Sequence, residues 1–130
     1  MTGFNRFPEI VVKFGPAVSQ IVRKSAFDVQ AQAAGAAPVD TGFLRNSIYT
    51  VTSTDSSYGG AGTPPKDAYL LPEVAKPEDA YTAHVAVGAN YGIYLEMGTR
   101  FMPAQPYFYP AVDSVEPSFL DAMSKLEDSL

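Results

Sequence analysis

The sequence predicts an α+β domain in which a long N-terminal helix packs on a small antiparallel β-sheet, with a C-terminal helix and long loops. Three observations indicate this fold class. Apolar residues recur at helical spacing near both ends of the chain, they alternate with a period of two in the middle, and stretches rich in Gly, Pro and Ser separate these segments. The length of 130 residues fits a single domain spanning 1–130.

The first helix is expected to begin near Pro16, because a proline suits the first helical turn, where its missing N–H would have no partner. It is expected to end at Gly35, ahead of Pro38. Residues 7–14 fit either an extra helical turn or a short extended segment, so that residues 1–15 are a possible N-terminal arm. The apolar stripe of this helix consists of Val18, Ile21, Val22, Ser25, Val29 and Ala33.

The middle of the chain is expected to form short strands. Ile48–Ser53 and Tyr81–Val87 are rich in β-branched and aromatic residues, and Tyr107–Tyr109 is a candidate for a further short strand. Residues 54–66 (TDSSYGGAGTPPK) have almost nothing to bury and are predicted to form a long flexible loop. A second helix is expected to open at Pro117. Its apolar stripe consists of Phe119, Leu120, Met123 and Leu126.

Composition excludes several classes of function. A net charge of −5 argues against a protein whose role is to bind nucleic-acid phosphates tightly. The absence of cysteine removes disulfides, thiolate chemistry and cysteine-ligated zinc, and fits synthesis in a reducing cytoplasm. No apolar run approaches the length of a membrane span or of a signal-peptide core. We therefore expect no membrane contact, no metal and no cofactor.

The residues that most often carry out catalysis are few and scattered. The single histidine, His84, falls on the outer face of a predicted strand, and no Gly-x-Ser-x-Gly turn presents a serine. The carboxylates of Asp40, Glu96 and Asp113 are far apart in the sequence, and nothing pairs them. We expect a protein that is not an enzyme. A small hydrolase using Asp40, Glu96 and His84 remains as an alternative.

Two stretches carry more specific residues than ordinary loops need. In the first, APVDTGFLRNSI (37–48), Asp40 or Thr41 is expected to cap a short helix and Gly42 to allow an unusual backbone angle. The apolar pair that follows should be buried, and the polar pair after it should face solvent. These pairs are Phe43 with Leu44 and Arg45 with Asn46.

The second stretch, ANYGIYLEMGTRFMPAQPYFYPAV (89–112), gathers six aromatic residues among prolines and glycines. A segment this apolar must either fold back on the core or contact another subunit, because large exposed apolar patches are rare on monomers. Its aromatic, Met and Arg content is that of an interface. A non-viral adaptor domain that uses this stretch as a peptide groove is a further alternative.

Together and in this order, the two stretches resemble the neck and tail-completion family of long-tailed bacteriophages, which carries "P-x-D-T-G-x-L-x-x-S-I", then "Y-x-x-Y-x-E-x-G-T" and "x-A-x-P-x-x-x-P-A". The first pattern matches Pro38, Asp40, Thr41, Gly42, Leu44, Ser47 and Ile48. The others match Tyr91, Tyr94, Glu96, Gly98 and Thr99, then Ala104, Pro106, Pro110 and Ala111. The chain departs from the family at Gly92, Leu95 and Met97, where Ala, Val and Phe are more usual, and its 54–66 loop is longer.

The resemblance implies a structural virion subunit of the head–tail junction, a neck, tail-completion or tail-terminator protein. Such a protein forms a closed ring, with a hexamer favoured, between the head-side connector and the tail-tube protein. DNA passes through its lumen without sequence-specific binding. It would reside in the virion after assembly in the bacterial host cytoplasm. As an expected interface with neighbouring subunits or partners we assign Asp40, Thr41, Gly42, Arg45, Tyr91, Tyr94, Glu96, Gly98, Thr99, Arg100, Pro106, Tyr107, Phe108 and Pro110.

Overall fold

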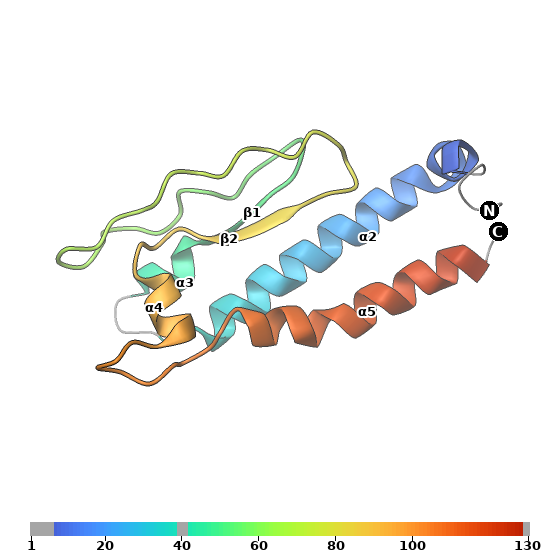
Figure 1. Ribbon diagram of the computed structural model, residues 1–130. Helices are drawn as coiled ribbons and strands as arrows, with labels where there is room; N and C mark the ends of the chain where they lie inside the picture. Colours follow the sequence, from blue (N-terminus) through green and yellow to red (C-terminus); the bar gives the residue numbers. More distant parts are fainter. Residues whose placement is uncertain (1–6, 39–41, 129–130) are drawn as a thin grey trace.

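The computed structural model describes residues 7–38 and 42–128 (Figure 1). Its elements confirm the predicted α+β class, with a long N-terminal helix, a two-stranded antiparallel sheet and a C-terminal helix. In chain order they are α2 (Phe7–Ala36), α3 (Phe43–Ser47), β1 (Ile48–Val51), β2 (His84–Val87), α4 (Gly92–Met97) and α5 (Tyr109–Asp128).

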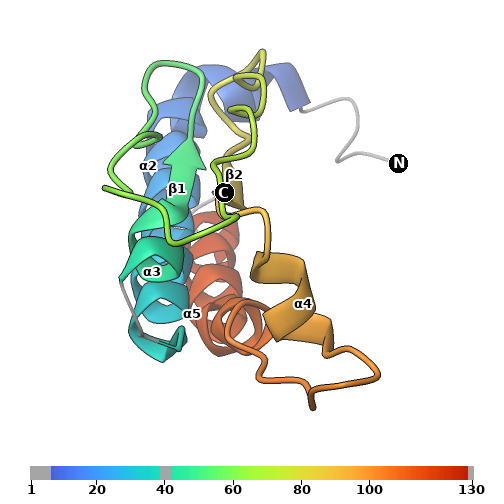
Figure 2. The same cartoon turned by 90° about the vertical axis from the view of Figure 1, so that its left-hand side faces the viewer.

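The two long helices form the base of the molecule. Helices α2 and α5 lie side by side and run in opposite directions (Figure 1). The β1–β2 pair lies along one side of this helix pair and contacts α2 through both of its strands (Figure 2). The short helices α3 and α4 sit at the end of the molecule where α2 ends and α5 begins (Figures 1 and 2). The segment that follows α4 therefore projects from this end.

Helix α2 begins at Phe7, so the expectation that it starts near Pro16 is wrong. Of the two alternatives for residues 7–14, the structure has the helical one. The first turns lie at an angle to the rest of the helix (Figure 1), as is typical when a proline inside a helix removes one backbone hydrogen bond. The C-terminal end at Ala36 agrees with the predicted stop next to Gly35.

Helix α5 also begins earlier than the sequence predicts. It starts at Tyr109, so Pro117 lies inside it, and Tyr107–Tyr109 is not a strand. Pro117 is exposed on the helix surface. The start of α5 is fixed by a contact with the side chain of Glu96 in α4, which local sequence signals do not reveal.

The sheet is shorter than the predicted strands but occupies their positions. Its antiparallel register pairs Ile48 with Val87 at one end and Val51 with His84 at the other. All of β1 is buried, whereas β2 is only partly covered. His84 is exposed, which confirms the prediction that it lies on the outer face of its strand.

A long irregular excursion, residues 52–83, joins β1 to β2 and extends past α3 before it returns (Figure 1). Its first part is held to α2, because the guanidinium of Arg23 donates two hydrogen bonds, of 2.9 and 2.6 Å, to the carboxylate of Asp55. Ala61 packs into the core from the same excursion. The predicted flexibility of the 54–66 loop stays a prediction.

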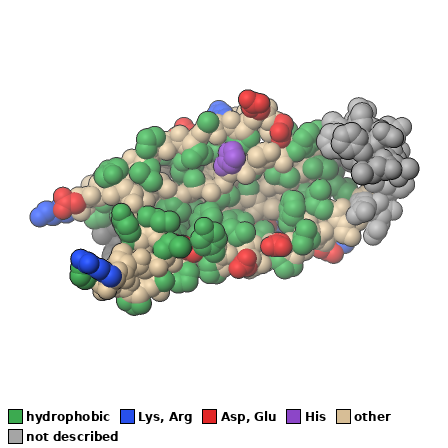
Figure 3. Space-filling view, in the orientation of Figure 1, with side chains coloured by type: hydrophobic (Ala, Val, Ile, Leu, Met, Phe, Trp, Pro, Cys, Tyr) green, Lys and Arg blue, Asp and Glu red, His purple; other side chains and the backbone are tan. Residues whose placement is uncertain are grey.

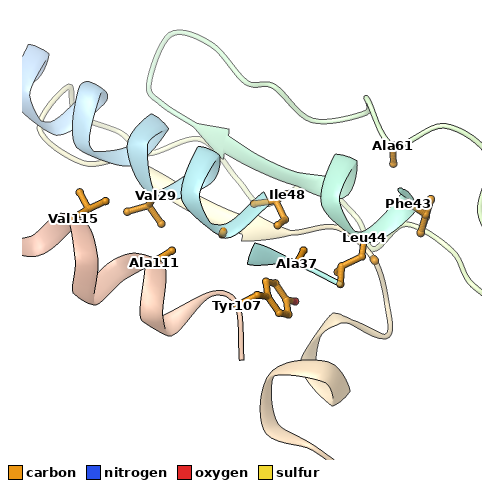
Figure 4. Close-up of a cluster of buried hydrophobic side chains, with 11 residues drawn as sticks. Val29, Ala37, Phe43, Leu44, Ile48, Ala61, Tyr107, Ala111 and Val115 are labelled. Carbon is orange, nitrogen blue, oxygen red and sulfur yellow. The ribbon is translucent and has the colours of Figure 1, made fainter. Parts of the chain in front are cut away.

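The hydrophobic core lies where α2, α3, β1 and the start of α5 meet (Figure 4). It confirms the predicted burial of Phe43 and Leu44, while Arg45 and Asn46 face solvent as predicted. The buried cluster consists of Val29, Ala33, Ala37, Phe43, Leu44, Ile48, Ala61, Ala89, Tyr107, Ala111 and Val115.

Candidate assembly interface

The carboxylate of Glu96 accepts hydrogen bonds from backbone N–H groups at the start of α5. Its Oε1 accepts hydrogen bonds from the backbone N–H groups of Tyr107 (2.9 Å) and Phe108 (2.8 Å), and its Oε2 accepts one from Tyr109 (3.1 Å). N–H groups at the start of a helix have no partner within the helix, and a carboxylate there also interacts favourably with the helix dipole. Glu96 is buried, with 7% of its surface exposed, so this contact fixes α4 against α5.

The surroundings of Glu96 keep it ionised. Burial alone raises the pKa of its carboxyl, but the hydrogen bonds from Phe108, Tyr107 and Tyr109 lower the pKa by more, so it lies below its ordinary value. The carboxylate is therefore charged at neutral pH and fully engaged within its own chain. It lies inside the fold, and its predicted place at an interface stays a prediction.

Tyr107 also holds α4 against the start of α5. Its hydroxyl donates a hydrogen bond of 3.0 Å to the carbonyl of Gly92, and only 1% of the residue is exposed. Burial, with the negative charge of Glu96 as a second cause, raises the pKa of Tyr107 above its ordinary value. A Cβ on Gly92 would lie 2.7 Å from the Tyr107 hydroxyl and 2.6 Å from Val87 Cγ1. The departure from the family pattern at Gly92 thus has a steric explanation.

The segment after α4 forms a tight turn. Thr99 and Met102 exchange backbone hydrogen bonds of 2.9 and 3.2 Å. Gly98 precedes the turn with φ of 77°, a conformation that favours glycine, and a Cβ on it would lie 2.7 Å from the backbone nitrogen of Ala104. The turn is therefore held by its own backbone and by close packing at its base.

The turn carries an exposed aromatic side chain at its tip. Phe101 is 84% exposed, and the Arg100 guanidinium lies over its ring at 4.7 Å from the centroid. Three apolar side chains of the preceding helix, α4, are also more than half exposed. We call Ile93, Tyr94, Met97 and Phe101 the α4 patch; their exposed fractions are 58%, 57%, 65% and 84%.

A groove with an apolar lining runs along β2 and between α2 and α5. Its volume is about 370 Å³. Apolar side chains fill the face seen in Figure 3 between β2 and α5, and acidic side chains border it. We call it the α2/α5 groove; it is lined by Val22, Ser25, Ala26, Val29, Ala83, Val85, Phe108, Val112, Val115, Glu116 and Phe119.

The residues predicted to form an interface fall into three groups. Glu96, Tyr107 and Gly42 are buried within the chain, and the left-handed backbone of Gly42 (φ 81°) precedes α3. Tyr91, Phe108 and Gly98 are partly buried. Those exposed to solvent are Arg45, Tyr94, Thr99, Arg100, Pro106 and Pro110. Asp40 and Thr41, with the cap expected from them, lie outside the described residues.

The sequence did not single out Ile93 and Met97, which the structure places on the exposed face of α4. A helix of six residues is too short to show a helical period, so only the position of Glu96 on the opposite, buried face could have indicated them.

Of the hydrolase alternative, Asp40 lies outside the described residues, and the structure does not join the other two, His84 and Glu96. Within residues 15–38 and 42–126, no hydrogen bond or ion pair joins His84 to Glu96, whose oxygens bind the backbone of α5. Asp113 is exposed on α5. The described residues contain no group of three or more His, Asp or Glu side chains placed to bind a metal. None of the described helices is long and apolar enough to span a bilayer.

Comparison of the sequence with known proteins identifies a family. No curated protein and no solved structure matches the chain significantly. Residues 4–98 match the model of the HK97-gp10-like family, described as "Bacteriophage HK97-gp10, putative tail-component". The match includes both motifs up to Gly98 and ends before the exposed turn. It argues against a non-viral adaptor and suggests a structural role without enzymatic activity. The chain therefore belongs to the HK97 gp10-like family of bacteriophage tail components.

Proposed function

We propose that this tail component is a ring-forming subunit of the head–tail junction. It would act as a neck, tail-completion or tail-terminator protein that joins the head-side connector to the tail-tube protein. The ring, with six copies favoured, would leave a lumen through which DNA passes without sequence-specific binding. The protein would be assembled in the host cytoplasm and retained in the virion. Membership of the tail-component family supports the coarse role.

The observation that carries the finer role is the α4 patch. Four large apolar side chains are each more than half exposed at one end of a small domain, next to a turn fixed by its own hydrogen bonds. A monomer in water gains nothing from such a surface, and contiguous exposed apolar patches generally mark contact sites. Rings need contact surfaces of this kind between subunits and towards their axial neighbours.

Deletion of the coding sequence from a phage that encodes this chain tests the role. The expected result is an accumulation of DNA-filled heads and separate tails, counted by negative-stain microscopy, and rescue by the wild-type chain supplied from a plasmid. A Tyr94→Ala/Met97→Ala variant should rescue poorly. Its matched control is Tyr69→Ala, which removes another exposed aromatic ring outside the α4 patch. Normal particles formed in the absence of the protein would contradict a junction role.

A further inference from the structure

We propose that neighbouring copies of this chain join head to tail, with the Arg100–Phe101 turn of one copy seated in the α2/α5 groove of the next. This inference rests on the proposed ring and specifies which two surfaces form its subunit contact. The occupant of the groove is therefore a second copy of the same chain.

The turn has the properties of a preformed anchor. Phe101 is the most exposed of the large apolar residues described, and the N–H of Phe101 donates to the Thr99 hydroxyl oxygen at 3.1 Å, which fixes the backbone beneath the ring. Arg100 stacks on that ring and is absent from the ion pairs of the described residues. An ordered aromatic and arginine pair loses little conformational entropy when it docks, and such residues dominate binding energies at interfaces.

The groove has the complementary properties. Its floor is apolar, with Val29 and Val115 buried and Val112 partly open to solvent. One wall is β2, from which the partly buried side chain of Val85 lines the groove. An aromatic side chain entering here would cover apolar surface that is now in contact with water.

Charge favours the same pairing. Glu116 lines the groove, and Asp113 lies one turn earlier on α5 and is also exposed. Neither carboxylate takes part in the ion pairs that the structure describes. When Phe101 enters the groove, Arg100 would reach its acidic border. Opposite charges at the edge of an apolar contact fix its register and select the correct partner.

The turn cannot reach the groove of its own chain. The turn lies beyond the start of α5 and points away from the helices, whereas the groove follows β2 and α5 towards the opposite end (Figures 1 and 3). Contacts between two different surfaces repeat from copy to copy and close into a ring when the rotation permits. The arrangement thus accounts for a ring rather than a two-fold dimer.

Cysteine cross-linking tests the contact directly, because the chain contains no cysteine of its own. The variant Arg100→Cys/Glu116→Cys retains Phe101 and carries one thiol on each surface. Oxidation should give a ladder of species beyond the dimer, both with the purified chain and with tails that carry it. Each single variant should stay uncross-linked. Dimers from one single variant, with no ladder from the double variant, would show a two-fold contact and overturn the proposal.

Sedimentation equilibrium provides a second test. Phe101→Ala should weaken association by about tenfold or more, as loss of an interface anchor does. Arg100→Glu should weaken it too, and Arg100→Glu/Glu116→Arg should restore part of the loss. Lys66→Glu, the same charge change at another exposed site, is the control and should leave association unchanged. If Phe101→Ala still formed intact rings and the double cysteine variant gave no ladder, the proposed contact would be wrong, but the junction role would stand. A wild-type chain absent from tails would instead overturn the role itself.

Discussion

The carboxylate of Glu96 accepts a hydrogen bond of 2.8 Å from the backbone N–H of Phe108, 12 positions further along the chain. The contact links α4 to the start of α5 and determines where the second long helix begins. In this chain the Glu and the Gly of the Y-x-x-Y-x-E-x-G-T pattern have different roles. Glu96 faces inwards to hold α5, and Gly98 permits the chain to leave α4 as an outward turn.

We expect Glu96→Ala to destabilise the fold by about 1–3 kcal/mol, because three buried or partly buried N–H groups at the start of α5 would lose a charged acceptor. Glu96→Gln keeps one acceptor oxygen and should cost less. The free energy of unfolding, measured by urea denaturation, provides the comparison. Equal stability of the wild type and Glu96→Ala would mean that water or another group replaces the carboxylate without loss.

Acid should destabilise the wild type more than Glu96→Gln. The folded-state pKa of Glu96 lies below its ordinary value of 4.5, so its contribution is complete above that pH and is lost as the pH falls through the lower, folded-state pKa. The Arg23 guanidinium, with the Thr52 hydroxyl as a second donor, lowers the pKa of Asp55 to about 2, so the loss of this pair extends to lower pH. Because both side chains are nearly half exposed, this second contribution is small.

Denaturation curves at pH 7, 5, 4 and 3 measure the difference, with Asp55→Asn as the control for the surface pair. The stability of Glu96→Gln should fall less steeply between pH 5 and pH 3 than that of the wild type. Parallel pH profiles for the two proteins would show that Glu96 has the same pKa in the folded and unfolded states.

Gly92→Ala should destabilise the protein by about 1–3 kcal/mol, the usual cost of overpacking a core. The new Cβ would lie only 2.7 Å from the Tyr107 hydroxyl and would displace it. That hydroxyl now donates a hydrogen bond to the Gly92 carbonyl. Gly35→Ala is a matched control near the end of α2, because a Cβ there meets nothing within 4 Å. That control should be neutral or stabilising, since alanine is the better helix former. Thermal unfolding of the two variants separates packing from backbone effects.

Local signals predicted the features that depend on neighbouring residues. Helical periodicity indicated the C-terminal part of α2 and its buried Val29 and Ala33, and alternation indicated the β1–β2 pair. The conformational freedom of glycine indicated the unusual backbone angle at Gly42. These features arise within a few residues, so composition and spacing are enough to reveal them.

Other features were mispredicted or missed, because neighbouring residues do not reveal them. Pro16 and Pro117 look like helix starts, but both lie inside helices whose first turns continue upstream. The sequence assigned Glu96 to an expected interface but could not reveal its hydrogen bonds to the backbone N–H groups of Tyr107, Phe108 and Tyr109. The exposed face of α4 could not be recognised because the helix is only six residues long.

Gly42 offers the last test, because its backbone can be probed without a steric clash. Its φ of 81° lies in the left-handed region, and the nearest atom to an added Cβ, Asn46 Nδ2, is 3.5 Å away. Gly42→Ala should therefore cost only the backbone strain of about 1–2 kcal/mol, and Gly42→Asn should cost less because asparagine visits this region more readily. Urea denaturation of the two variants measures the order. If alanine were tolerated as well as asparagine, the entry to α3 would not require a left-handed residue, and the glycine of the first motif would need another explanation.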